Sequence, residues 1–267
     1  MEAAIAHAAR LNSEGVLLMN EGADMESAKA LTEALSIMQS QLAQQDSIAA
    51  APQQSPMSPL SSSSKPSIEF SSQGISLKSS SSIFIFNRGI YFRLPCSSPN
   101  KLMMNPLVQQ QEIKELVHVY CVAIIFNLAL LYHKRALTHD NDNCYRKADD
   151  LYRKITLILG YPNSLETTGT DCNPMRLSDS ASIIMIAAIN NMSQIRYERG
   201  HYDLAEDGIR ALSHILQISS PSIATIPIQG GPSTTNQTAT ANTTAEFWNQ
   251  IVLNVLLMKQ PSLAAAA

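Results

Sequence analysis

The residues best suited to bind a metal ion gather in one short stretch of the sequence. This stretch contains His133, His139, Asp140, Asp142 and Cys144. Asp140-x-Asp142 begins like a calcium-binding loop, whose ligands are oxygen atoms at fixed spacing. Tyr145 then stands where the loop requires glycine, and Leu151 stands where it requires its last carboxylate. The stretch is therefore interpreted as a solvated turn, and no metal site is predicted.

Catalytic motifs are also missing from the sequence. It contains no GxSxG, no HExxH, no phosphate-binding loop and no dinucleotide fingerprint. His201 and His214 stand singly, with no nucleophile motif near them. We therefore predict a non-enzymatic protein with no cofactor.

Charge gives little support for binding to nucleic acid or to an anionic membrane. The 19 Lys and Arg against 22 Asp and Glu give a net charge of -3. No run of five basic residues occurs, so the electrostatic attraction that polyanions need is missing. Four cysteines far apart in the sequence are typical of a reducing compartment rather than of a disulfide framework.

Targeting segments are not predicted either. Met1 to Leu18 has neither a basic start nor a continuous apolar core, and so does not resemble a signal peptide. The longest apolar run, Leu116 to Tyr132, is interrupted by His118 and Asn127 and is shorter than the roughly 20 residues that cross a bilayer. We interpret it as a buried core helix and expect a cytoplasmic or nuclear protein.

Apolar residues at helical spacing predict three antiparallel helix pairs. The first pair covers 2–19 and 24–45, the second 106–138 and 142–160, and the third 178–198 and 202–218. A last helix near 245–258 is expected to cap the stack, and an alanine tail follows it to residue 267. The predicted organisation is thus 1–45, an insertion over 46–105, the two further pairs over 106–218, a low-complexity loop over 219–244, and 245–267.

The insertion has two parts with different composition. Residues 47–82 are rich in Ser, Pro and Gln and are expected to be mobile, because such a segment cannot bury enough apolar surface to order itself. The apolar and aromatic stretch IFIFNRGIYFRLP, residues 83–95, predicts a short strand or hairpin. It could be a local flap, could clip onto the first helix pair, or could fold back into a groove like a ligand. Ser-Pro pairs at 55, 58 and 98 are possible phosphorylation sites.

The helix pairs resemble tetratricopeptide repeats. In the second pair, Ile125, Leu128, Ala129 and Tyr132 follow the family pattern of large and small residues on one face of the first helix. The third pair matches it with Ile189, Met192 and Ser193, then Gly200, Tyr202, Ala205, Ile209 and Leu212. Arg196 replaces the expected aromatic residue, and the pairs lack the regular spacing of about 34 residues. With its serine-rich insertion, the IFIF stretch, the paired Asn and the PSLAAAA ending, the chain also resembles uncharacterised proteins of expanded diatom families, a resemblance that implies no activity.

The tetratricopeptide resemblance implies a peptide-binding groove lined by the first helix of each pair. Asn127 and Asn191 match the position where the family often places an Asn that contacts a peptide backbone. Alternatively, each Asn caps or bridges its own neighbouring helix. The predicted groove residues are Phe126, Asn127, Leu130, Lys134, Asn190, Asn191, Gln194 and Tyr197, and His133 shares the groove face of its helix. The carboxylate clamp that holds chaperone tails is disfavoured, since Asn12, Val16, Ala187 and Asn191 occupy its basic positions.

The sequence therefore predicts an all-α, irregular tetratricopeptide-like solenoid with a short β element. The first functional hypothesis is a scaffold that binds a protein or peptide partner through the groove. The alternative is a structural subunit of a homo- or hetero-oligomer, with contacts through the last helix and the Ile83–Leu94 segment.

Overall fold

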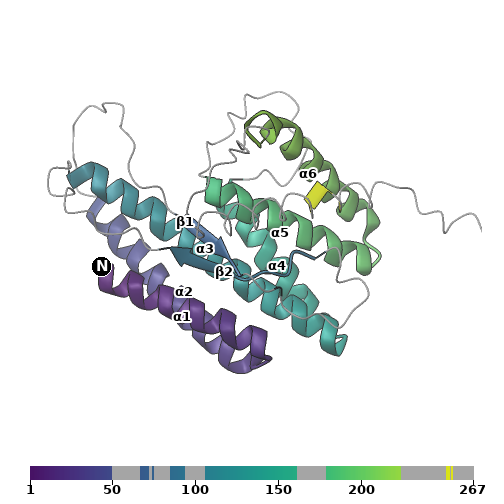
Figure 1. The fold of residues 1–267 in the computed structure, drawn as a ribbon, viewed down its shortest axis with the longest axis horizontal. Coiled ribbons are helices and arrows are strands. Elements are labelled where there is room, and N and C mark those ends of the chain that lie inside the picture. The colour runs from purple at the N-terminus through teal and green to yellow at the C-terminus, as the bar shows by residue number, and fades with distance from the viewer. Residues whose placement is uncertain are drawn as a thin grey trace, which may run out of the picture.

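The computed structural model describes residues 1–49, 67–71, 74, 85–93, 106–160, 179–223, 251–252 and 254. This part of the chain is mostly helical, with one small antiparallel sheet, as predicted (Figure 1). The elements are α1 (Glu2–Glu21), α2 (Asp24–Ala49), β1 (Ser67–Phe70), β2 (Ile90–Arg93), α3 (Pro106–His139), α4 (Asp142–Ile158), α5 (Asp179–Glu198) and α6 (Tyr202–Ile223).

Tight turns join the helices of each pair. α1 ends at Gly22, whose positive φ of 84° suits a residue without Cβ, and the Ala23 N–H donates to the Leu18 carbonyl at 2.9 Å. α5 ends in the same manner at Gly200, with φ of 76°. At the α3–α4 turn, the Asn141 side chain caps α4 by accepting from two backbone N–H groups. These turns hold each pair antiparallel.

α3 is the central helix of the arrangement. Each helix packs on the next along the chain, and α3 also contacts α1 and α5 (Figure 1). Its side chains Tyr120, Ile124 and Leu131 are completely buried. The first helices of the three pairs are therefore neighbours in space and share a common side of the molecule.

The apolar stretch of α3 is longer than the predicted run from Leu116 to Tyr132. Among the described residues, Ile113–His139 is long and apolar enough to cross a membrane by length and composition alone. However, 83% of its apolar window is buried against the rest of the protein. A helix enclosed by other helices in this way has the surroundings of a core helix, as the sequence analysis interpreted it.

The sheet corrects the prediction for the serine-rich insertion. β2 pairs with β1, with Ile68 opposite Phe92 and Phe70 opposite Ile90. The expectation of a mobile segment over 47–82 is therefore wrong for Ser67–Phe70, because Ile68 and Phe70 pack against the core. The short strand predicted within residues 83–95 is confirmed as β2, but its partner is β1 from the serine-rich part of the insertion and not the other half of the same stretch, so the hairpin alternative is wrong.

The helix boundaries differ from the predicted ones by a few residues. α2 continues to Ala49 and α6 to Ile223, so α6 includes the first residues of the predicted 219–244 loop. The remainder of that loop, the Ser-Pro pairs and most of the predicted last helix lie outside the described residues. Ile251, Val252 and Asn254 are described, and they are helical.

Candidate functional site

An extended segment of the chain lies against the first helices of the three pairs. This docked segment, residues 85–90, immediately precedes and enters β2. The exposed fractions of Ile85, Phe86 and Ile90 are 3%, 4% and 0%. These three side chains are thus enclosed as deeply as the helical core, although the segment contains almost no regular secondary structure.

Asn191 of α5 holds the backbone at one end of the docked segment. The Phe86 N–H donates to Asn191 Oδ1 at 2.8 Å, and Asn191 Nδ2 donates to the Phe86 carbonyl at 3.0 Å. Nδ2 also donates to the Tyr152 hydroxyl at 3.0 Å. One side chain therefore satisfies both backbone groups of Phe86, and Tyr152 fixes its orientation.

Asn127 of α3 repeats this arrangement at Ile90. The Ile90 N–H donates to Asn127 Oδ1 at 2.8 Å, and Asn127 Nδ2 donates to the Ile90 carbonyl at 2.8 Å. Asn12 of α1 donates to the same carbonyl from its Nδ2 at 2.8 Å, and its Oδ1 accepts from Asn127. All three Asn side chains are completely buried.

We call the surface formed by Asn12, Asn127, Asn191 and the adjoining Phe126 and Val16 the docking face. An amide group carries a donor and an acceptor side by side, and so matches the N–H and C=O of one extended residue. Buried backbone groups without such partners would be costly. We call Asn127 and Asn191, each bonded to both backbone groups of one residue, the two Asn clamps. Their hydrogen bonds go to the backbone of the docked segment and not to its side chains.

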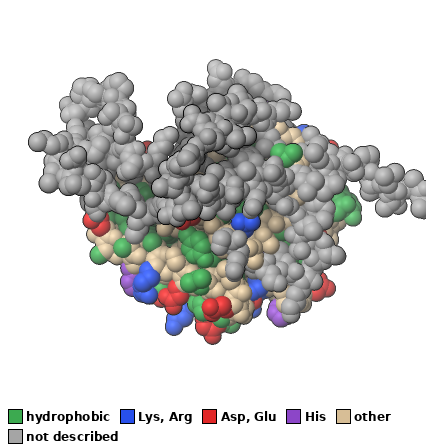
Figure 2. Space-filling model, in the orientation of Figure 1, with side chains coloured by type: hydrophobic (Ala, Val, Ile, Leu, Met, Phe, Trp, Pro, Cys, Tyr) green, Lys and Arg blue, Asp and Glu red, His purple; other side chains and the backbone are tan. Residues whose placement is uncertain are grey.

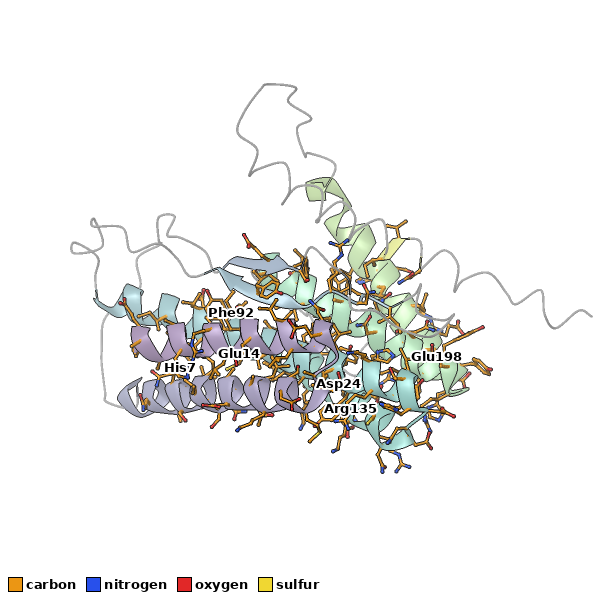
Figure 3. The ribbon with its side chains drawn as sticks, turned by 60° about the horizontal axis from the view of Figure 1, so that its bottom comes forward. His7, Glu14, Asp24, Phe92, Arg135 and Glu198 are labelled. Carbon is orange, nitrogen blue, oxygen red and sulfur yellow. The ribbon has the colours of Figure 1, made fainter. Side chains whose placement is uncertain are left out.

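Aromatic rings surround Phe86. Its ring centroid lies 4.9 Å from that of Phe70 in an edge-on contact and 6.2 Å from that of Phe126. Phe126 in turn lies 5.7 Å from Tyr152. Further along the sheet, Phe92 stacks on Tyr120 of α3 at 4.1 Å; Figure 3 shows Phe92 where the strands meet α1 and α3.

A further Asn connects the docking face to the C-terminal part of the chain. Asn190 Nδ2 donates to Asn191 Oδ1 at 3.1 Å, and Asn254 Nδ2 donates to Asn190 Oδ1 at 2.8 Å. Asn190 is thus a supporting residue behind the Asn191 clamp. Ile251, one turn before Asn254, is completely buried beside it in the core.

The predicted groove residues fall into two groups. Asn127 and Asn191 bind the docked segment, Phe126 packs near Phe86, and Asn190 supports Asn191. Leu130 is completely buried in the apolar core. The first four of these residues thus form or support the docking face.

The other predicted residues have different partners. Lys134 Nζ donates to the Met19 carbonyl at 2.8 Å and pairs with Asp24 at 3.0 Å, so it ties α3 to the α1–α2 turn (Figure 3 labels Asp24). Gln194 Nε2 donates to Glu198 at 2.9 Å. Tyr197 is 46% exposed and packs edge-on against Tyr202. Lys134 and Tyr197 therefore contact neighbouring helices, and Gln194 bonds the last residue of its own helix.

Two residues of the docking arrangement, Asn12 and Gly89, were not predicted from the sequence to take part in it. Asn12 occupies in α1 the position that Asn127 and Asn191 occupy in α3 and α5, so an Asn repeated in three first helices was the available signal. Gly89 gave no local signal. A Cβ placed on it would lie 2.5 Å from Val16 Cγ1, a contact between residues far apart in the sequence.

The possible metal-binding stretch does not form a site. Within the described part of the chain, no group of three or more His, Cys, Asp or Glu side chains could hold a metal ion. His133 is completely buried, and its ring lies 6.2 Å from those of both Tyr145 and Tyr152. Asp142 instead pairs with Arg199 at 2.6 Å at the surface, which lowers the pKa of its carboxyl group.

His133 should make the protein less stable in mild acid. Burial lowers its pKa from 6.5 to about 3, because neither ring nitrogen has a hydrogen-bond partner. Between these values the unfolded chain binds a proton that the folded chain does not. Stability should therefore be full above pH 6.5 and fall by up to about 1.4 kcal/mol per pH unit below it. Urea unfolding from pH 7.5 to 5 measures this slope.

The matched variants for this test are His133→Leu and His201→Gln. His133→Leu should flatten the slope over that pH range, while the exposed His201→Gln should leave it unchanged. An equal slope in His133→Leu and the wild type would show that His133 is not responsible.

Removing the Tyr152 hydroxyl should loosen the Asn191 clamp without releasing it. Tyr152→Phe leaves one N–H of Asn191 without its partner while the bonds to Phe86 remain, so a loss of about 1 kcal/mol is expected. Amide exchange at Phe86 should become about five- to tenfold faster, because the same loss of free energy raises the population of the open state. Tyr145→Phe is the control, since Tyr145 is also buried and its hydroxyl is not among the hydrogen-bond partners of the Asn191 amide. Equal exchange in the two variants would contradict the positioning role.

Charged side chains of both signs are mixed on the face of the molecule that Figure 2 shows. Acidic and basic side chains alternate with apolar ones along the lower edge in Figure 2. Several charges are paired within one helix, as in Arg210 with Glu206. Such surface pairs contribute little to stability.

Similarity to other proteins gives no indication of the function of this chain. No protein-family model, curated protein or solved structure matches the chain.

Proposed function

We propose that the chain is a non-enzymatic, tetratricopeptide-like interaction scaffold of the cytoplasm or nucleus. Its docking face binds an extended peptide of a partner protein, and its own docked segment occupies that face until the partner replaces it. The observation that carries the proposal is the pair of Asn clamps, each bonded to both backbone groups of one residue.

The recognition of backbone rather than side chain supports exchange of the occupant. Main-chain hydrogen bonds can be made by any extended peptide of suitable fit, which is the basis of strand-addition recognition. The segment that now makes them lies between separate helical pairs and belongs to neither. The neighbouring α1, α3 and α5, each with one Asn on the shared side, also support a solenoid arrangement of the three pairs.

Because the docked segment is part of the same chain, a partner peptide must compete with it for the docking face. A tethered ligand competes at an effective concentration on the order of millimolar. A free peptide with the same contacts would therefore bind the intact protein weakly. A variant with its own segment undocked should bind the same peptide well.

Ile90→Asp is suitable for undocking the segment. Ile90 is completely buried, so a carboxylate there would lose its hydration with no compensating partner. Leu17→Asp is the matched control, because it makes the same change in polarity at a site on α1 that is 54% exposed. Circular dichroism should show equal helicity in the wild type and both variants.

Binding is measured with a fluorescent peptide of residues 83–94, IFIFNRGIYFRL, carrying a lysine tail for solubility. The peptide should saturate Ile90→Asp at micromolar concentration and bind the wild type and Leu17→Asp at least about tenfold more weakly, because of the tethered competitor. Adding Asn127→Ala and Asn191→Ala to Ile90→Asp should abolish binding. A peptide with the same residues in scrambled order controls for non-specific binding.

Absence of binding to a fully helical Ile90→Asp variant would overturn the scaffold proposal. If that variant loses helicity, the same titration on the milder Gly89→Ala variant decides the question.

The alternative function is a subunit of a homo-oligomer. The same docked segment would then enter the docking face of a second copy, as in domain swapping. Molar mass by light scattering distinguishes the two: a scaffold with its segment in cis is a monomer at micromolar concentration, whereas an assembly unit is not.

A further inference from the structure

We propose that the partner peptide carries an aliphatic–aromatic–x–x–Gly–branched aliphatic motif, bound in the register of residues 85–90. This inference rests on the proposed function and adds the chemistry of the ligand. It comes from the side-chain sites between and beside the two Asn clamps, which restrict what the backbone contacts alone would admit.

The two clamps fix the spacing of the motif. Asn191 holds the residue at position 86, and Asn127 holds the one at position 90. Both amides are buried on different helices and are held by Tyr152 and Asn12 respectively, so neither can move to follow a shorter or longer spacing. Inserting or deleting one residue between the two positions would leave one clamp without its partners.

The first two motif positions require apolar side chains. Ile85 and Phe86 are 3% and 4% exposed, and the Phe86 ring contacts Phe70 and Phe126. An aromatic ring gains both burial and edge-on contacts at this site. A charged or small side chain would lose most of this interaction.

The glycine position is set by contact with α1. A Cβ at position 89 would lie 2.5 Å from Val16 Cγ1 and 3.1 Å from Val16 Cγ2. Gly89 is not among the described glycines with positive φ, so space and not backbone conformation requires glycine here. Val16 is itself completely buried and has little freedom to move away.

The remaining positions differ in selectivity. Ile90 is completely buried, and therefore requires an apolar side chain that fits the same space. Asn87 and Arg88 are only half-buried, and the hydrogen bond that the Arg88 guanidinium donates to the Ser71 carbonyl is long, at 3.3 Å, and only part-buried. These two positions are expected to accept varied residues, which gives the x–x of the motif.

Competition between peptides tests the motif on the Ile90→Asp protein. Relative to the parent peptide of residues 83–94, the peptides with Gly89→Ala or Phe86→Ala should bind at least about tenfold more weakly, from overpacking and from lost burial respectively. The peptide with one alanine inserted after Asn87 should bind comparably poorly. Arg88→Ala, the matched control, should bind within about twofold.

A change in the protein should restore binding of one weakened peptide. Adding Val16→Ala to the Ile90→Asp protein removes the two atoms nearest to the new Cβ and leaves only Val16 Cβ, at an ordinary contact distance of 3.4 Å. The Gly89→Ala peptide should then bind within about threefold of the parent. Circular dichroism and the parent peptide's own affinity show whether Val16→Ala leaves the docking face intact. An unchanged deficit of the Gly89→Ala peptide in an intact Val16→Ala protein would overturn the glycine position.

The outcomes separate this inference from the proposed function. Equal binding of all the altered peptides would refute the motif and leave the scaffold in place. Failure of the parent peptide to bind would refute the scaffold and the motif with it.

Discussion

Replacing Asn127 and Asn191 together with alanine is expected to release the docked segment while the six described helices remain formed. The change removes both partners of the Phe86 and Ile90 N–H groups, which would otherwise stay buried and unsatisfied. Each such group costs about 1–3 kcal/mol, so docking should weaken by several kcal/mol. Hydrogen exchange at the Phe86 and Ile90 amides should accelerate by about a hundredfold or more.

The control for this variant is Asn143→Ala. Asn143 is exposed near the start of α4, so its replacement should alter neither exchange nor stability measurably. Trypsin cleavage after Arg88 gives a second measurement, and it should be fast only in the double variant. Continued protection of both amides in the double variant would show that apolar contacts alone hold the segment.

Gly89→Ala should weaken docking of the segment by the second largest amount, and adding Val16→Ala should restore part of the lost docking free energy. The added methyl group would meet Val16 Cγ1 at 2.5 Å, so overpacking is expected to cost about 1–3 kcal/mol of docking free energy. Val16→Ala alone creates a cavity and also destabilises. In the double variant the new methyl partly fills that space, so the two losses should not add.

A double-mutant cycle measures this coupling. Urea unfolding and amide exchange at Ile90 should both give a favourable interaction energy of about 1 kcal/mol or more between the two substitutions. Pairing Gly89→Ala with Ala205→Gly, at a buried position of α6, is the matched control and should be additive. Additive losses for Val16 and Gly89 would mean that the two residues do not contact each other as described.

Periodicity in the sequence was sufficient to predict the helices. The three pairs follow the recurrence of apolar residues at helical spacing, and Gly22 and Gly200 mark two of the turns. The same reasoning selected Asn127 and Asn191, because an amide in an apolar helix must find a partner. The sequence left open which partner that would be, and it was the chain's own backbone.

The missed features depend on contacts between distant residues. β1 lies in a serine-rich stretch, and its four residues form a strand because β2 pairs with them. The steric role of Gly89 depends on Val16 of α1. Lys134 matched the groove pattern, but the carbonyl of Met19 and the carboxylate of Asp24 lie within its reach. The pattern of neighbouring residues in the sequence does not show which distant group a side chain will contact.

The most direct test of exchange is to observe the docked segment leaving its own protein. Gly89→Ala protein is labelled with nitrogen-15, and unlabelled peptide of residues 83–94 is added up to millimolar concentration. The account predicts that the labelled Phe86 and Ile90 amides lose protection from exchange as peptide binds, while the α3 amides stay protected. Saturable peptide binding with both labelled amides still protected, or no binding at millimolar peptide, would contradict it.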